Sequence, residues 1–456
     1  MTRLPPGPRD SLFGLRLGGR FRRNPLRFLT NLLRDYGDLA MFRLGPFRCC
    51  LVNHPDLIRE VLITQRPLFP KLERHLRTIR SFSGNNIFVS DGERWPRQRQ
   101  LLQPAFQPRM FERYAQATVK HAQRLVAEWS DGAELDLVQA MARLAVVSIG
   151  EALFQVDLSD RVEVCRRALN IHSETLRDEF RALFVLPDWL PTAAKRRKKW
   201  AVRTLCELIR ETFRERRAAG GGGDDLLSIL LAAVNDPRSE SRMTQQQALD
   251  EATILFVAGQ DDITAALSWC WCLLAQNREC EERFRAELAT QLGGRLPGYA
   301  DVARLPFTEM ILKETLRLYP PTWTLVPRCA AREVTLGGFR IPRGTWLFIS
   351  PYATHRDPRF FPVPERFDPD RFSPERQPAA QFAYIPFGGG PRICIGNHFS
   401  FTLLTMALAT IAQRFRMTLC DDPAAIVPDP GLALRPRGGL RVRLEAIASQ
   451  ASTAIA

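Results

Sequence analysis

The stretch Phe387–Gly396, FGGGPRICIG, holds four glycines and one cysteine in ten residues. Glycines let the backbone adopt conformations that other residues avoid, and they allow a flat ligand to lie directly against the main chain. A helical pattern follows at once, from Gly396 to about Phe415. Cys394 therefore stands at the positive end of a helix dipole, which stabilises a thiolate. The pattern predicts a ligand here and not a disulfide partner.

The spacing of the cysteines limits which metal Cys394 binds. No CxxC pair occurs anywhere in the chain, and a zinc ribbon or a thioredoxin-type site would need one. Since no second cysteine or histidine stands at chelating spacing, the metal should bring its remaining ligands. Haem iron does so and leaves an axial position for the protein. Arg392 is then expected to pair with a haem propionate, and Phe387 to cover the sulfur.

Composition restricts the class of protein. The chain has 456 residues, 45% of them hydrophobic and 25% charged, as expected of a globular protein with a large core. Its net charge of +15 is spread along the sequence, so we expect no nucleic-acid binding. The dense run Lys195–Lys199 (KRRKK) is interpreted as a solvated helix face or loop, or alternatively as a site for an acidic protein. Scattered cysteines and the lack of a signal peptide or transmembrane segment predict a cytoplasmic protein.

Periodicity predicts a mainly α chain with smaller β-sheets, an α+β fold class. The longest helical pattern, Gln246–Asn277, is apolar on nearly all sides and should cross the core. A short helix is expected near Pro25–Tyr36, hairpins at Gly45-Pro46 and at Gly337-Gly338, and a flexible break over residues 218–225. We expect one domain over residues 1–446 and a mobile tail over residues 447–456.

A five-residue signature carries a family resemblance. Phe387, Gly390, Arg392, Cys394 and Gly396 match every fixed position of F-x-x-G-x-R-x-C-x-G. The chain thereby resembles the cytochrome P-450 family of haem-thiolate monooxygenases, in its soluble bacterial form, over roughly residues 4–446. The resemblance implies the cytochrome P-450 fold, with haem b between the long central helix and the cysteine-loop helix. It also implies cofactor contacts from Cys394, the metal ligand, and from Gly388.

Other motifs of the family follow in the expected order. Glu314 and Arg317 look like its E-x-x-R pair, with Arg366 of PERF as the third member of a buried triad. Alone, the pair would be an exposed ion pair of about 0.2–0.5 kcal/mol. Three further residues resemble propionate ligands: Trp95 and Arg99 of W-x-x-x-R, and Arg328. Each could also be an ordinary core residue or surface charge.

The central helix departs from the family pattern. In AGQDDITA, Ala258 and Gly259 match the small pair that leaves room for dioxygen, and Asp261 matches the acid. The usual threonine is replaced by Asp262. Thr264 cannot substitute, because two helical steps turn its side chain about 200° away. Our hypothesis is that Asp262 delivers protons, with its pKa raised by burial and by Asp261. Alternatively, the substrate supplies the hydroxyl, or the enzyme performs a less usual oxidation.

The resemblance also implies a substrate pocket and partners. The expected pocket residues are Phe82, Phe88, Phe256, Ala258, Trp323 and Leu325. They favour a hydrophobic substrate such as a fatty acid, a terpenoid or another natural-product-like molecule. Oxygen comes from O2, and electrons come from a separate ferredoxin or flavodoxin with its NAD(P)H reductase, attracted by a basic surface that includes Arg97. A haem-thiolate sensor or binding protein without turnover remains the alternative from another class.

Overall fold

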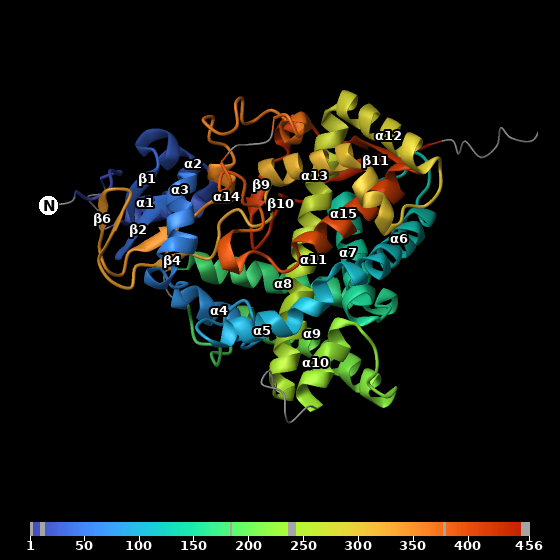
Figure 1. The fold of residues 1–456 in the computed structure, drawn as a ribbon, viewed down its shortest axis with the longest axis horizontal. Helices are drawn as coiled ribbons and strands as arrows, with labels where there is room; N and C mark the ends of the chain where they lie inside the picture. Colours follow the sequence, from blue (N-terminus) through green and yellow to red (C-terminus); the bar gives the residue numbers. More distant parts are fainter. Residues whose placement is uncertain (1–2, 10–13, 183–184, 236–242, 377–379, 448–456) are drawn as a thin grey trace, which may run out of the picture.

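The computed structural model describes residues 3–9, 14–182, 185–235, 243–376 and 380–447. Strands β1, β2, β4 and β6 gather at one end of the molecule, and helices α6, α7, α12 and α15 lie at the other (Figure 1). The α-helices are α1 (Leu15–Arg23), α2 (Pro25–Tyr36), α3 (Pro55–Arg59), α4 (Glu73–Ser83), α5 (Arg94–Leu102), α6 (Phe111–Ala127), α7 (Leu137–Phe154), α8 (Val162–Arg181), α9 (Ala193–Ala218), α10 (Leu226–Asn235), α11 (Gln245–Gln276), α12 (Arg278–Leu292), α13 (Pro306–Leu318), α14 (Pro351–Thr354) and α15 (Asn397–Ala412).

The strands form small sheets, mostly antiparallel. The largest has the order β1-β2-β7-β4, and its β2–β7 pair is parallel. A second has the order β3-β11-β8, and two further pairs are β5–β6 and β9–β10. The strands are β1 (Leu39–Leu44), β2 (Phe47–Val52), β3 (Glu134–Asp136), β4 (Arg328–Cys329), β5 (Val334–Leu336), β6 (Phe339–Ile341), β7 (Trp346–Phe348), β8 (Phe415–Leu419), β9 (Pro428–Pro430), β10 (Leu434–Pro436) and β11 (Arg441–Ala446). The mainly α fold with small sheets is thus confirmed, as are the two predicted hairpins.

The central helix α11 agrees with the sequence pattern to within one residue at each end. It begins with a capping box, in which the Thr244 side chain and Gln247 satisfy each other's backbone N–H groups. Most of its residues are buried. In its C-terminal half Trp269 stacks on Tyr319, the residue after α13, with ring centroids 3.7 Å apart, and donates a hydrogen bond to the Leu434 carbonyl. These contacts hold the C-terminal half of α11 against the segment after α13 and against β10.

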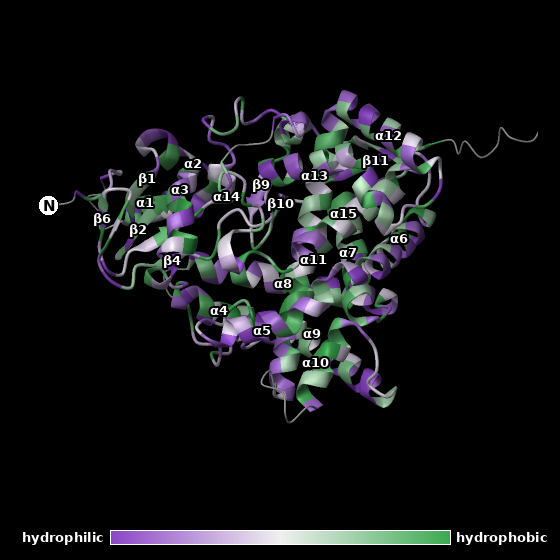
Figure 2. Ribbon diagram, in the orientation of Figure 1, coloured by the Kyte–Doolittle hydropathy of each residue, from purple (hydrophilic) through white to green (hydrophobic). Residues whose placement is uncertain are grey.

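Two further apolar helices complete the core. Helix α15 starts directly after the cysteine loop and is buried along nearly its whole length. Helix α7 is long and apolar enough to cross a membrane by length and composition, but 72% of its residues are buried inside the protein. It has the character of a core helix. Figure 2 shows hydrophilic residues on peripheral helices such as α12.

Several local predictions can be compared with the structure. Helix α9 ends at Ala218 and α10 begins at Leu226, so the glycine-rich break is confirmed. The tail, apart from Ile447, lies outside the described residues, and the single domain stays a prediction.

The interpretation of the basic run on α9 as a solvated face is wrong for two of its residues. Lys195 and Lys198 are only 8% and 4% exposed. The ammonium groups of both bind Glu179 of α8 and Asp188, at 2.6–3.2 Å. Lys198 also donates to the Ser81 hydroxyl of α4, at 2.8 Å. These contacts tie α4, α8 and α9 together.

Candidate functional site

The cysteine loop folds back on itself. The Cys394 amide donates to the Phe387 carbonyl at 3.0 Å, and the Ile393 amide donates to the Gly390 carbonyl at 3.1 Å. Gly388 and Gly390 have φ of 72° and 70°, in the left-handed region that favours glycine. The Phe387 ring packs against Phe401 of α15, with centroids 5.8 Å apart. The loop thus rests on the helix that it opens.

Close packing also requires glycine in this loop. A Cβ on Gly390 would stand 3.1 Å from the Leu62 carbonyl oxygen, and a Cβ on Gly389 only 2.5 Å from the Phe382 ring. At Gly396 a Cβ would lie 3.9 Å from the sulfur of Cys394. The backbone therefore approaches the sulfur with no side chain between them.

The Cys394 thiol is accessible although protein surrounds it. Burial raises its pKa to about 11; the Asp262 charge raises it further, and the Gly396 amide and Arg99 oppose the shift. Without a metal the sulfur is therefore protonated at neutral pH. Metal binding replaces that proton. Among the described residues, no three His, Cys, Asp or Glu side chains gather as a metal site.

A cationic group lies beside the loop. Arg392 stacks over the Trp95 ring at 4.3 Å from its centroid and donates to the Ser90 carbonyl at 2.7 Å. It also pairs with Asp91. Arg99 donates to the Ile393 carbonyl at 3.0 Å. The sequence motifs around Trp95 and Cys394 thus meet in space.

Two more cations complete this group. Arg328 is pushed to a pKa of about 10 by burial and then by Arg392, and its buried Nε has no hydrogen-bond partner. Lys71 forms a β-bridge with Arg328 and donates to the Phe88 carbonyl. Burial, followed by Arg392 and Arg328, lowers the pKa of Lys71 to about 7. Such crowded, desolvated cations are suited to an anionic ligand. Sequence reasoning missed Lys71, because no periodic pattern or motif marks it.

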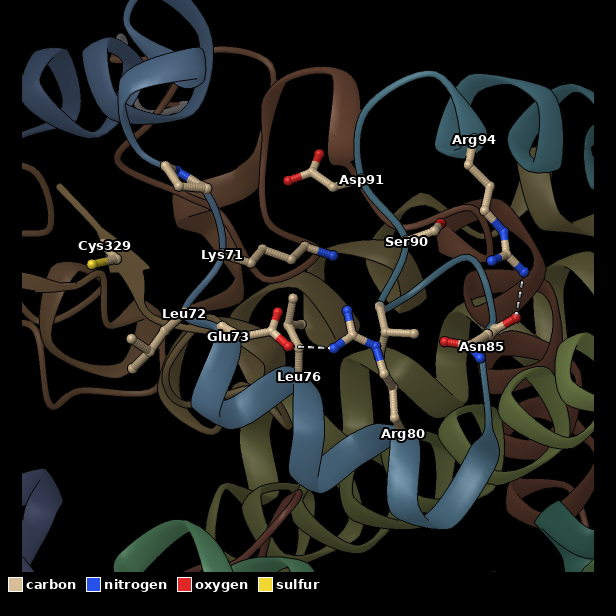
Figure 3. A pocket seen from close by; sticks show the side chains of 12 residues that line it. Lys71, Leu72, Glu73, Leu76, Arg80, Asn85, Ser90, Asp91, Arg94 and Cys329 are labelled. Atoms are coloured by element: carbon tan, nitrogen blue, oxygen red, sulfur yellow. Dashed lines mark hydrogen bonds and ion pairs between the residues drawn. The ribbon is translucent and has the colours of Figure 1, made fainter. Parts of the chain in front are cut away.

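A cavity of about 500 Å³ borders these cations. Figure 3 shows Lys71 extending toward the segment that carries Ser90 and Asp91. Arg80 pairs with Glu73 on the cavity wall at 2.6 Å. The lining residues are Pro70, Lys71, Leu72, Glu73, Leu76, Arg80, Asn85, Val89, Ser90, Asp91, Arg94 and Cys329. Charged groups and apolar side chains share this cavity.

The middle of α11 presents a small residue and an acid. Ala258 is exposed, whereas Val257 and Gln260 beside it are buried. The expected role of Gly259 is not supported by its surroundings, because its Cβ would meet Ile149 of α7 at 3.2 Å. Packing against α7 explains this glycine, and Ala258 is the small residue on the accessible side.

The two aspartates have different environments. Asp261 is buried and pairs with Arg435. Loss of water around Asp262 raises its pKa to about 7; the Asp261 charge adds to this shift and Arg435 opposes it. No described residue donates a hydrogen bond to the Asp262 carboxylate. Thr264 is fully buried, and its hydroxyl donates to the Gln260 carbonyl at 2.8 Å. The inference that Thr264 does not replace the missing threonine agrees with this geometry.

The E-x-x-R pair is buried and bidentate. Arg317 donates to Glu314 at 2.7 and 2.9 Å, and both side chains are 0% exposed. The proposed third member needs correction. Arg366 is exposed and contributes only its carbonyl, which accepts from Arg317 at 3.2 Å. The second guanidinium at Glu314 belongs to Arg371, at 3.4 Å.

The expected pocket residues divide into two groups. Phe256 is 1% exposed and packs on Phe154, and the Trp323 indole donates to the Gly431 carbonyl at 3.0 Å. Both are core residues and not pocket walls, which corrects the prediction. Leu325 would contact a Cβ on Gly388, at 3.8 Å, so it does lie beside the cysteine loop.

The two phenylalanines of the α4 region also differ from expectation. Phe82 is buried beneath His172 and Lys198, 4.7 and 4.4 Å from its ring centroid. Phe88 is 40% exposed and lies below the Lys71 ammonium at 4.9 Å. The Phe88 ring therefore packs against a cation and does not form an apolar wall of a substrate pocket.

The described residues fit a haem. An accessible sulfur lies on a glycine-rich loop, and its pKa responds to the charge of Asp262 on α11. Arg392, Arg99, Arg328 and Lys71 form a cationic group suited to propionates, and the Nε of Arg328 lacks a partner. The arrangement supplies a sulfur ligand together with cationic partners for a dianionic cofactor.

Comparisons with known proteins agree with this site. The family model described as Cytochrome P450 matches residues 5–441. Cyclooctatin synthase of Streptomyces melanosporofaciens is 37% identical over 93% of this chain and 91% of its own. Cyclooctat-9-en-7-ol 5-monooxygenase of the same organism is 35% identical over 87% and 85%. Pentalenene oxygenase of Streptomyces avermitilis is 34% identical over 93% of each chain.

A solved structure extends the likeness to the fold. The crystal structure of the cytochrome P450DA heme domain matches with a TM-score of 0.86 and 25% sequence identity, covering 98% of both chains. Sequence motifs, buried geometry and the whole-chain matches lead to one assignment. The chain belongs to the cytochrome P450 family of haem-thiolate monooxygenases.

Proposed function

We propose that this monooxygenase inserts one oxygen atom from O2 into an apolar terpenoid, with Cys394 as the axial ligand of its haem. The observation that carries the proposal is the accessible Cys394 sulfur, electrostatically coupled to Asp262 and bordered by the cationic group. The names of three similar proteins, which concern cyclooctatin, cyclooctat-9-en-7-ol and pentalenene, support a terpenoid over a fatty acid. The bound haem would supply oxygen activation.

The cationic residues hold the cofactor in this proposal. Arg392, Arg328 and Lys71 would bind the propionates, and charge-assisted hydrogen bonds of this kind are among the strongest in proteins. Trp95 supports Arg392 by stacking, and Arg99 fixes the cysteine loop through the Ile393 carbonyl. A propionate bound there would also give the unpaired Nε of Arg328 a partner.

Asp262 is the proposed proton donor. Its pKa of about 7 means that the carboxyl holds a proton part of the time at neutral pH. The neighbouring Asp261 charge adds to this raised pKa of Asp262, and Arg435, which pairs with Asp261, opposes it. The Asp262 carboxyl oxygens have no competing partner among the described residues. They can therefore give up a proton on the side of α11 that faces Cys394 and recover it from water.

Electrons reach this site from a separate protein. Arg97 on α5 is well exposed, with a side-chain accessibility of 67%, and α5 also carries Arg99 beside the cysteine loop. A basic surface here favours an acidic ferredoxin or flavodoxin, so that raised salt should slow reduction. All ten cysteines are free, which supports a reducing, cytoplasmic location.

The spectrum of the reduced, carbon-monoxide-bound protein tests this function. A thiolate-type spectrum in the wild type, lost in Cys394→His, is expected. Titration with cyclic terpenoids and with fatty acids of equal carbon number then compares substrate classes through the haem spin-state shift. Nitrogen-type coordination in the wild type would overturn the assignment of Cys394. A shift with fatty acids alone would overturn the terpenoid substrate.

A further inference from the structure

Two neighbouring acids of α11 lie apart from the proposed proton donor. Asp250 and Glu251 occupy the second turn of the helix and are 9% and 0% exposed. Asp250 accepts from the Asn85 amide at 2.7 Å and from the Gln246 side chain at 2.8 Å. Glu251 accepts from the Ile87 amide at 2.9 Å. Both carboxylates therefore bind the backbone of residues 84–91, here named the anchor loop, which connects α4 toward α5.

The anchor loop approaches α11 too closely for any side chain at its first residue. A Cβ on Gly84 would lie 2.2 Å from the Asp250 carboxylate, and the φ of Gly84 is +67°. Asn86, fully buried, fixes the loop from within, since its side-chain oxygen accepts from the Phe88 amide at 3.0 Å. The backbone of the anchor loop therefore packs against the central helix in one position.

The other end of the anchor loop contacts two residues of the cationic group. Its Phe88 carbonyl accepts from Lys71, and its Ser90 carbonyl accepts from Arg392 at 2.7 Å. Asp91 adds an ion pair to Arg392. Any shift of the loop relative to α11 would move these carbonyls and the two cations with them.

Glu251 also reaches helix α5. The Gln98 side-chain nitrogen lies 2.5 Å from Glu251 Oε1, while the Gln98 side-chain oxygen is buried without a partner. Rotating the Gln98 amide would bring its oxygen against Oε1, where a protonated Glu251 can donate to it. Burial, the dominant cause, raises the pKa of Glu251 to about 8, which agrees with the protonated form. The contact joins α11 to the helix that carries Trp95 and Arg99.

We infer that Glu251 is a positioning residue for the haem, which acts through the anchor loop and Gln98 to hold Lys71, Arg392 and Trp95 at the propionate edge. The inference rests on the proposed haem-thiolate function. Glu251 touches neither the cysteine loop nor the cationic side chains, so it acts only through the groups that it fixes. One side chain thereby couples α11 to both segments that approach the propionates from the N-terminal half of the chain.

The test compares Glu251→Gln with Glu251→Leu in the haem-loaded protein. Glutamine keeps an acceptor for the Ile87 amide and a partner for Gln98, whereas leucine keeps only the volume. We measure the rate of haem transfer to an excess of apomyoglobin. The leucine variant should release haem at least tenfold faster than the wild type, and the glutamine variant within about threefold of it. Hydrogen exchange should rise at residues 85–90 in the leucine variant alone.

Two further variants keep the result unambiguous. Leu267→Ala removes a fully buried side chain from the far half of α11, so it reports the effect of destabilising this helix without touching the anchor loop. Because Glu251→Leu can fail to fold, Gln98→Met tests the same contact from α5 and should also accelerate haem release.

Three results would overturn the inference. The first is a rate of haem release in Glu251→Leu equal to that of the wild type or, if that variant does not fold, such a rate in Gln98→Met. The second is an equal rate of release in the glutamine and leucine variants. The third is a rate in Leu267→Ala as high as that in Glu251→Leu. The carbon-monoxide spectrum of the wild type separates this inference from the proposed function. A thiolate-type spectrum with unaltered haem release refutes the role of Glu251 alone, whereas nitrogen-type coordination in the wild type refutes the function on which it rests.

Discussion

Replacing Glu314 by alanine should destabilise the protein severely, while replacing Arg366 should not. Glu314 accepts two hydrogen bonds from Arg317, one from the Asp368 amide at 2.9 Å, and an ion pair from Arg371. Alanine would leave Arg317, which is 0% exposed, without its counter-charge. Removing one partner of a buried pair costs about 3–5 kcal/mol. That is a large share of the roughly 5–15 kcal/mol by which folded proteins are stable.

The arginines that contact this pair provide a graded comparison. Arg371→Ala should cost about 1–3 kcal/mol, because it removes a buried guanidinium that pairs with Glu314 and donates to the Val363 carbonyl at 2.8 Å. Arg366→Ala should stay within about 0.5 kcal/mol, since only its backbone carbonyl is used. Urea unfolding followed by circular dichroism gives the order, and haem content per chain gives a second measure. If Arg366→Ala were as damaging as Arg371→Ala, the triad described here would be wrong.

Four further outcomes are expected. Arg328→Leu should speed haem transfer to apomyoglobin about tenfold to a hundredfold, the effect of roughly 1.5–3 kcal/mol for a charged hydrogen bond. It should also raise the urea midpoint of the haem-free protein, because it removes a cation whose buried Nε has no partner. If Asp262 delivers protons in its protonated form, the product formed per NADPH should fall as pH rises through about 7. Asp262→Asn should lower this ratio and remove its pH dependence. An unchanged ratio of product to NADPH in the variant would exclude Asp262 as the proton donor. Burial and then Lys198 lower the pKa of His172 to about 3. The free energy of unfolding should therefore fall as pH falls from about 6.5 toward 3, because the unfolded chain binds a proton there that the folded chain does not. Urea unfolding at a series of pH values should show a shallower fall for His172→Phe, and an identical fall would contradict the shift. Because the pKa of Glu251 is raised to about 8, the folded state keeps a proton that the unfolded chain releases. The contribution of this residue to the free energy of unfolding should therefore be lost as pH rises from about 4.5 to about 8. Glu251→Gln should remove this part of the pH dependence of stability, and a stability profile that superimposes on that of the wild type would refute the prediction.

The cysteine loop and the E-x-x-R pair could be predicted because their chemistry depends on local spacing. Four glycines directly before a helical pattern indicate a tightly turned loop that leads into a helix. Glu314 and Arg317 lie three residues apart, which places them on one helical face. The boundaries of α11 were equally accessible, since a long apolar run between a threonine cap and a charged segment has few alternatives.

Contacts between distant irregular segments could not be predicted. Arg366 and Arg371 lie in the same proline-rich stretch, where no periodicity fixes the direction of a side chain, so the motif selected the wrong guanidinium. Phe256 lies on a helix that is apolar all round, and such a pattern does not reveal which face borders the core. Lys71 reaches Arg328 through a single β-bridge across more than 250 residues.

The same physics explains the misjudged lysines. Lys195 and Lys198 look solvated in sequence because the acids that neutralise them, Glu179 and Asp188, belong to another helix and to the connection after it. A run of charges indicates exposure only when its partners are absent from the fold.

The seat of Gly84 against Asp250 matters for redesign of the enzyme. A mutagenesis library aimed at new substrates would naturally randomise the stretch between α4 and α5, which borders the described cavity. At position 84 every other amino acid would collide with the carboxylate, so most clones altered there should be recovered as colourless protein. Ala258, which is exposed, and Leu325, which is partly exposed, are better positions to randomise, because neither belongs to the anchor loop or to its ion pairs.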